Sequence, residues 1–293
     1  MLCKTPGAQI RFAKEELRSY PVSEVCRVIG VCRSNYYREP VKSESEKTAE
    51  EQAVIHCFNA NDRNYGRIRL KKELSKAGIA VSEYRISRIL KENQLVAKGG
   101  RPRTAKKRKT PEKQYMEENL LKDKFSVTEA NYLWCSDITE IEYKHGKLYL
   151  CCIIDVATRR IVGWSIERNQ RQSLVQAAFQ MAVGRNPKRP EGAIYHSDRG
   201  CQYTAKKTKE MVEKAGFRKS MSRPGTPNDN QPIESFWRTL KTEVGNLKVY
   251  TYAQAYKKLR WYIEMYYNSS RIHSGIAYCV PNEFFTLLSV SVS

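Results

Sequence analysis

The feature that most restricts how this chain can fold is a basic run at residues 98–113, KGGRPRTAKKRKTPEK. It carries eight basic residues against one acid and has no large apolar side chain that could join a core. Such a run predicts an extended, self-repelling linker. The chain is thereby divided into a helical part and a strand-rich part, with expected segments at 1–42, 43–97, 98–122 and 123–285.

Two helical segments precede the predicted linker. Residues 21–38 indicate two short helices around a turn at Gly30, which is the outline of a helix-turn-helix. Residues 43–97 form a second all-α domain of helix-turn-helix type, in which Gly78 follows one helix as a C-cap residue and Ser82 caps the next.

The last helix of this second domain has one apolar face and one basic face. Ile86 and Ile89 share the apolar face, whereas Arg85 and Arg88 lie off it. We interpret Arg85 and Arg88 as DNA contacts. The alternative is a helical hairpin with a solvated basic face.

The charge of the whole chain favours a nucleic-acid partner. Lys and Arg number 52 against 31 Asp and Glu, a net charge of +21, and neutralised phosphates release counterions. The linker is therefore interpreted either as a solubilising segment or as one that follows a DNA backbone. Its predicted phosphate contacts are Arg101, Arg103, Lys106, Lys107 and Arg108.

The cysteines and the hydropathy of the chain predict where in the cell the protein is located. The nine cysteines are scattered without a CxxC pair, so we expect reduced core residues, with neither a disulfide framework nor a zinc site. No apolar run approaches the ~18 residues of a membrane span. The expected location is cytoplasmic, in association with the nucleoid, without a membrane partner.

After the linker the pattern changes to strands. Segments 131–143, 147–158 and 160–167 are rich in β-branched and aromatic residues and predict three sequential antiparallel strands. Helices and strands then alternate: we expect helices at 172–183 and 205–216, and strands at 192–198 and 217–222. This order implies an α/β fold, a mixed sheet with helices on its faces.

Three carboxylates fall at informative places in this pattern. Asp137 lies within the first strand, Asp198 ends the fourth, and Glu234 follows the turn-rich stretch RPGTPNDNQPI in the first turn of a helix. Each also has an ordinary explanation: Asp137 pairs with a basic residue, Asp198 caps a turn, and Glu234 meets a helix dipole.

Together the three carboxylates predict a metal site. Neighbouring central strands bring Asp137 and Asp198 side by side, and the helix delivers Glu234 against them. Three such groups repel one another unless cations lie between them. Mg²⁺ is the natural ion for oxygen ligands, and two Mg²⁺ ions can serve phosphodiester chemistry.

Six stretches of the chain together form a recognisable pattern: NYGRIRLKKEL, WCSDIT, IIDVATRRIVGW, HSDRGCQYT, SMSRPGTPNDNQPIESFWRTLKTE and YYNSSRIHS. Between Asp198 and Glu234 lie 35 residues. In these stretches and in this spacing the chain resembles, over nearly its whole length, the second-reading-frame (OrfB) transposases of bacterial insertion sequences, which share a ribonuclease H-like core with retroviral integrases.

The resemblance implies a function. Asp137, Asp198 and Glu234 would be catalytic and would bind two Mg²⁺ ions, which Mn²⁺ could replace. Water would cleave the element's ends, and the freed 3′-OH would attack a second phosphodiester. The implied partners are double-stranded DNA (terminal inverted repeats and target), other copies of the chain on that DNA, and an upstream-frame (OrfA) product, separate or fused.

Two other functions are weighed against this one. A helix-turn-helix regulator with a dead catalytic domain suits the basic N-terminal half, but an intact triad at the family spacing argues against it. A retroelement-type integrase should carry an HHCC zinc module, and no such spacing of His and Cys occurs here.

Supporting residues follow from helical spacing and from the resemblance. Arg238 and Lys241 share a face with Glu234 and are expected to grip DNA phosphates, with solvated charge as the alternative. Arg271, in the C-terminal motif, is expected either to contact DNA or to pack behind the site. Asp155 is interpreted as structural, and His196 as a residue of the sheet.

The sequence also departs from the family pattern. Thr226, Asn228 and Gln231 replace the residues common in the loop before Glu234. Cys201 replaces a common Ser, and Ala277 a common Gly.

Overall fold

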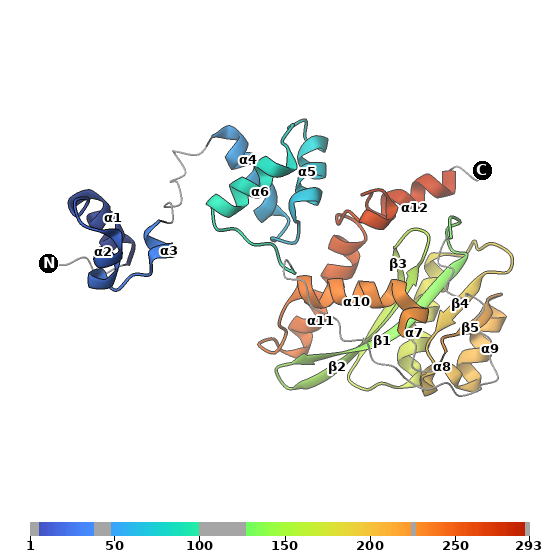
Figure 1. Ribbon diagram of the computed structural model, residues 1–293. Coiled ribbons are helices and arrows are strands. Elements are labelled where there is room, and N and C mark those ends of the chain that lie inside the picture. Colours follow the sequence, from blue (N-terminus) through green and yellow to red (C-terminus); the bar gives the residue numbers. More distant parts are fainter. Residues whose placement is uncertain (1–5, 38–47, 100–126, 224–226, 291–293) are drawn as a thin grey trace. The chain divides into compact units, whose positions relative to one another are not determined.

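A computed structural model describes residues 6–37, 48–99, 127–223 and 227–290 (Figure 1). The chain divides into two compact units, Met1–Ala97 and Lys98–Ser293. The predicted linker contacts Arg101, Arg103, Lys106, Lys107 and Arg108 lie outside the described residues.

The first unit consists of helices, as predicted. The first helices are α1 (Pro6–Glu16), α2 (Val22–Ile29) and α3 (Arg33–Tyr36). Gly30 closes α2 in the left-handed conformation, with φ 68°, and so makes the predicted turn. Ala13, Val25, Cys26 and Tyr36 form the small core of these helices.

Three further helices of this unit pack on one another. They are α4 (Ala49–Ala60), α5 (Arg67–Lys76) and α6 (Glu83–Glu92). The Ser82 side chain accepts a hydrogen bond from the Arg85 backbone N–H and caps α6 as expected. Ile86 and Ile89 are fully buried, which confirms the predicted apolar face.

The second unit is built on a five-stranded mixed sheet. Its strands are β1 (Leu133–Tyr143), β2 (Gly146–Asp155), β3 (Ile161–Glu167), β4 (Ile194–Ser197) and β5 (Arg218–Met221), in the order β3-β2-β1-β4-β5. β1 to β3 pair antiparallel, whereas β4 pairs parallel with β1 and with β5. This is the predicted ribonuclease H-like arrangement.

Helices cover both faces of the sheet. They are α7 (Gln172–Arg185), α8 (Cys201–Thr204), α9 (Lys206–Lys214), α10 (Gln231–Val244), α11 (Tyr252–Trp261) and α12 (Pro281–Val290). The short α8 was not predicted. Three further short segments are η2 (Pro227–Asn230), η3 (Tyr262–Tyr267, a π-helical turn) and η4 (Ser274–Ile276).

Alternation along β1 and β2 sends side chains into two separate cores. Trp134, Cys151 and Ile153 pack with α7 and α9, whereas Cys135 and Cys152 pack with α10 and α11. Asp137 is two residues beyond Cys135 and therefore lies on the α10 face.

Close packing between α7 and β3 depends on a glycine. A Cβ atom on Gly163 would lie 2.2 Å from the carbonyl oxygen of Ala178 and 2.7 Å from the Cβ of Ala182. Any side chain at this position would push α7 off the sheet.

The cysteine prediction holds in part. All cysteines in the described ranges are free thiols, and Cys135, Cys151 and Cys152 are core residues. Cys32 and Cys201 are exposed, so the expectation of core placement is wrong for these two. Among the described helices, none is long and apolar enough to cross a membrane.

Candidate active site

Asp137 is the most buried of the three predicted carboxylates. Its Oδ2 accepts a hydrogen bond of 2.8 Å from the indole Nε1 of Trp237 on α10. Burial first, and then the charges of Asp198 and Glu234, together raise the pKa of Asp137 to about 7 against the opposing effect of the Trp237 hydrogen bond. The three carboxylates are therefore electrostatically coupled.

Asp198 follows directly on β4. The parallel register pairs Ser136 on β1 with Ser197 on β4. The residues that follow these two in the sequence are Asp137 and Asp198. Asp198 is exposed, and its Oδ1 accepts a hydrogen bond of 3.0 Å from the Gly200 backbone N–H. The expected side-by-side arrangement on neighbouring strands is thus present.

Glu234 lies in the first turn of α10 and is exposed. The start of this helix is tied to the sheet, because the Asn230 side-chain amide donates a 3.0 Å hydrogen bond to the Ser136 carbonyl oxygen. Trp237 follows Glu234 by three residues, about one turn. The hydrogen bond from Trp237 to Asp137 therefore holds the first turns of α10, which also carry Glu234, against β1.

Just before α10, a buried carboxylate forms an ion pair with an arginine. Asp229 is 1% exposed and accepts hydrogen bonds from the Arg223 backbone N–H at 2.7 Å and from the Arg223 Nε at 2.9 Å. Sequence reasoning missed this pair and the Asn230 anchor, because both residues lie in a stretch that predicts only turns.

No group of three His, Cys, Asp or Glu side chains in the described ranges is close enough together to form a ready-made metal site. The residues still suit a divalent cation. All three side chains offer hard oxygens, and the half-buried Asp137 is near two exposed carboxylates that disfavour its ionised form. A bound cation would reverse this effect as Asp198 and Glu234 turn toward it.

Two neighbouring acid–base residues have structural roles, as predicted. Asp155 is fully buried and accepts hydrogen bonds from the backbone N–H groups of Asn131 and Thr158. His196 is buried within β4, with its ring nitrogens 2.9 Å from the Ser220 hydroxyl and 3.0 Å from the Ser222 hydroxyl. Burial lowers the pKa of His196 to about 4.

The two predicted DNA contacts on α6 have ion-pair partners. Arg85 donates to Glu50 at 2.7 Å and to the buried Glu51 at 3.2 Å, both on α4. Arg88 pairs with Glu92 one turn along the same helix. Arg85 thus links two helices of its own domain, and a DNA contact by either residue stays a prediction.

The predicted basic residues of the catalytic unit differ in exposure. Arg238 and Lys241 are exposed on α10, where a DNA contact is open to them. Arg271 is 3% exposed and bonds Glu243 through Nε and Nη2, the latter at 2.7 Å. Its contacts support packing, because a DNA contact would require it to leave Glu243.

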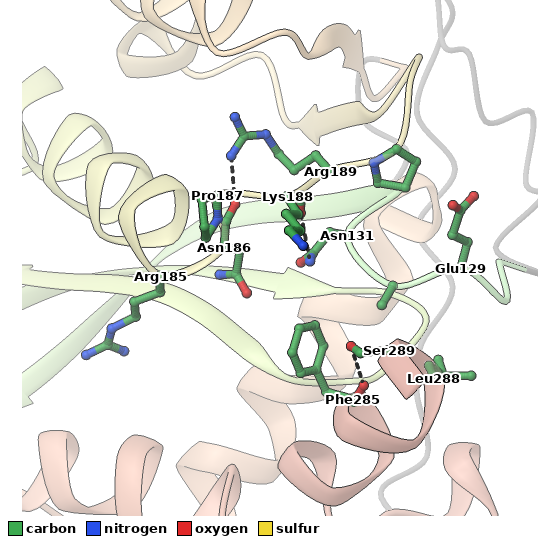
Figure 2. A pocket seen from close by; sticks show the side chains of 12 residues that line it. Glu129, Asn131, Arg185, Asn186, Pro187, Lys188, Arg189, Phe285, Leu288 and Ser289 are labelled. Carbon is green, nitrogen blue, oxygen red and sulfur yellow. Dashed lines mark hydrogen bonds between the residues drawn. The ribbon is translucent and has the colours of Figure 1, made fainter. Parts of the chain in front are cut away.

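A cavity of about 550 Å³ lies elsewhere in this unit (Figure 2). It is lined by residues 129–131 before β1, residues 185–190 before β4, and Phe285, Leu288 and Ser289 of α12. Because β1 and β4 are parallel, this cavity is at their amino ends, whereas Asp198 follows the carboxyl end of β4. None of the three carboxylates lines it.

Comparisons with known families agree with the two-unit organisation. An HTH-like domain matches residues 44–103, and two models of the integrase core domain match residues 127–227 and 215–281. In solved structures, the magnesium complex of the HTLV-2 integrase catalytic core is 15% identical, covering 54% of this chain and 97% of that one, with a TM-score of 0.43.

Curated relatives extend over nearly the full length. The transposase for insertion sequence element IS904 of Lactococcus lactis is 35% identical over 85% of this chain and 98% of its own length. The InsF transposase for IS3 of Escherichia coli is 30% identical over 93% of this chain and 96% of its own.

The fold is that of a ribonuclease H-like integrase core, preceded by a DNA-binding helical domain. The chain belongs to the family of insertion-sequence transposases that includes InsF of IS3. Its activity is accordingly DNA transposition, carried out by an enzyme of the polynucleotidyl transferase type.

Proposed function

We propose that the chain is a metal-dependent DNA strand transferase in which Asp137, Asp198 and Glu234 hold two Mg²⁺ ions. The bound ions would activate the attacking oxygen and stabilise the leaving one. Water first attacks the phosphodiester at an end of the element. The freed 3′-OH then attacks a second phosphodiester, and the protein supplies no covalent nucleophile.

The observation that carries the proposal is the electrostatic coupling of the three carboxylates. Burial and the charges of Asp198 and Glu234 act together on the pKa of Asp137. Keeping a carboxylate in such a place costs stability unless a cation neutralises it. Oxygen ligands on two strands and one helix suit Mg²⁺, and Mn²⁺ fits the same ligands.

The DNA is held by positive charge on both units. Arg238 and Lys241 lie one and two turns after Glu234 on the same side of α10 and contact phosphates beside the scissile bond. The helical domain that contains α6 binds the terminal repeats, with Arg88 among its contacts. The chain acts as a homo-oligomer at the nucleoid, alone or with an upstream-frame product.

Cleavage of DNA that contains an element end tests the assignment. Asp137→Ala, Asp198→Ala and Glu234→Ala should each lower the cleavage rate at least a thousandfold, with DNA affinity nearly unchanged, and EDTA should abolish wild-type cleavage. Glu140→Ala is the matched control, because Glu140 is also on β1 and pairs with Lys147 at the surface. Near-normal cleavage by any of the three Ala variants would remove that residue from the site.

The same assay tests the regulator alternative. A regulator with a dead catalytic domain would bind end DNA but cleave nothing in either Mg²⁺ or Mn²⁺.

A further inference from the structure

Behind the proposed site, three side chains of the catalytic unit form a closed hydrogen-bond network. Arg271 donates to Glu243 through Nε at 2.9 and 3.0 Å and through Nη2 at 2.7 Å. The Tyr262 hydroxyl donates to Oε2 of the same carboxylate at 2.8 Å. The side chains of Arg271 and Glu243 are only 3% and 6% exposed.

Glu243 and Glu234 are on the same helix but on opposite sides of it. They are nine residues apart, which corresponds to about two and a half turns and about 13 Å along the axis. The network therefore holds the back of α10, whereas Glu234 lies on its front near Asp137. Any rotation of α10 that breaks the network also turns Glu234 away.

Apolar packing does not define this rotation as strictly. Besides Trp237, which bonds Asp137 near the start of the helix, the buried face of α10 contains Ile233, Phe236, Leu240 and Val244, and such apolar side chains exchange neighbours at modest cost. A buried carboxylate has far less freedom, because losing its partner leaves an uncompensated charge. Glu243 can therefore occupy only the position in which it meets Arg271.

Arg271 is itself fixed to the sheet. Its backbone N–H donates to the Tyr266 carbonyl oxygen at 2.8 Å. Just before it, the Asn268 side chain accepts from the Ile161 N–H and donates to the Ile161 carbonyl oxygen, both at 2.9 Å. A rigid connection thus runs from β3 through this segment to α10.

We propose that Arg271 and Glu243 are positioning residues that set the rotation of α10 and thereby direct Glu234 toward Asp137. The inference rests on the proposed function, because it assigns a geometric task within the same site. It also gives the C-terminal YYNSSRIHS segment a role other than DNA contact.

An apolar replacement of the network tests this role. The triple variant Glu243→Met, Tyr262→Phe, Arg271→Met removes all its polar groups together, so no buried charge is left unpaired and the unit should still fold. The single variant Arg271→Lys keeps the charge but loses the two-point geometry. The matched control removes a surface pair, Glu140→Gln with Lys147→Met.

Three quantities are measured on the full chain: the single-turnover cleavage rate, the affinity for end DNA, and the rise in melting temperature caused by Mn²⁺. We expect the triple variant to cleave at least tenfold more slowly and to need about tenfold more Mn²⁺ for its rise in melting temperature. Its DNA affinity should stay within about twofold, Arg271→Lys should be intermediate, and the control should match the wild type.

The outcomes separate this inference from the proposed function. A wild type without metal-dependent cleavage refutes the proposed function. A wild type that cleaves, beside a folded triple variant of equal rate and equal Mn²⁺ response, refutes only the positioning role. If the triple variant does not fold, Arg271→Lys decides, and a wild-type rate and Mn²⁺ response in that variant overturn the inference.

Discussion

Replacing Asp137 by Asn should stabilise the metal-free protein while it abolishes cleavage. The structural reason is that Asp137 is half-buried beside two other carboxylates, which raises its pKa to about 7 from an ordinary value of 3.8. Asn has the same shape and can still accept the Trp237 hydrogen bond, but it has no charge to bury.

The size of the effect follows from the two pKa values. Between about pH 4 and pH 7 the unfolded chain has lost the Asp137 proton and the folded chain keeps it, so stability falls as the pH rises through this window. At about 1.36 kcal/mol for each pKa unit, the raised pKa of Asp137 costs about 2 kcal/mol near pH 5.5, where the folded protein must keep the proton, and about 4 kcal/mol above pH 8, where the carboxylate is ionised. For a unit of this size, 4 kcal/mol corresponds to about 10 °C in melting temperature.

The assay is thermal unfolding in EDTA at pH 5.5 and pH 8.5, with variant and wild type compared at the same pH so that other titrating groups cancel. Asp137→Asn should gain about 2 kcal/mol over the wild type at the lower pH and about 4 kcal/mol at the higher. Added Mg²⁺ should then stabilise the wild type and leave the variant unchanged.

Asp155→Asn is the matched control for the same chemical change. Asp155 is fully buried, whereas Asp137 is half-buried, and both Asp155 oxygens accept hydrogen bonds from Asn131 and Thr158. Burial raises the pKa of Asp155 only to about 6, and an amide NH₂ cannot accept the hydrogen bonds of the oxygen that it replaces, so Asp155→Asn should gain less stability than Asp137→Asn at both pH values. A destabilised Asp137→Asn, or a gain independent of pH, would refute the reasoning about Asp137.

Three other substitutions have effects of defined sign. Ala277→Gly should stabilise by about 0.5 to 1 kcal/mol in urea unfolding, because Ala277 has φ 54°, where glycine is favoured; a loss would contradict this. Gly163→Ala should cost about 3 kcal/mol or more in the same assay, since its Cβ would meet the Ala178 carbonyl oxygen at 2.2 Å. Trp237→Phe removes the hydrogen bond that lowers the pKa of Asp137, so the pKa of Asp137 in the metal-free protein should rise when it is followed by NMR titration; an unchanged pKa would count against the role of that hydrogen bond.

Much of the fold could be predicted because local pattern and tertiary structure agree. The β-branched and aromatic segments after the linker became β1, β2 and β3, with boundaries shifted by at most three residues. Asp137 and Asp198 could be placed together because alternation and strand order fix a side chain's face and neighbours. Ala277 was noted as a departure from a common glycine, and its positive φ explains why glycine is common there.

The remainder depended on contacts between distant residues. Arg85 was expected to face DNA from its helical position, but acidic residues on α4, 34 and 35 positions earlier, bind it. Trp237 lies on the buried face of α10, where helical spacing indicates only core packing, although its indole N–H reaches Asp137, 100 positions away. One-dimensional periodicity shows which face a residue is on, but not which polar group meets it there.

The lengths of the two central strands explain why the candidate site forms where it does. β1 runs from Leu133 to Tyr143, but β4 pairs with it only as far as Ser136. From Asp137 onward β1 has its β2 partner on one side and an edge that β4 no longer covers on the other. The chain leaves the sheet after Ser197, so Asp198 lies where this uncovered edge of β1 begins. Helix α10 begins beside it, because the Asn230 side chain donates a hydrogen bond to the carbonyl oxygen of the last paired residue, Ser136. A carboxylate one position earlier on β1 would lie on the opposite face, within the α7 core. Asp137 is therefore the first β1 residue on the α10 face beyond the end of β4, which is why we propose that metal and DNA bind there.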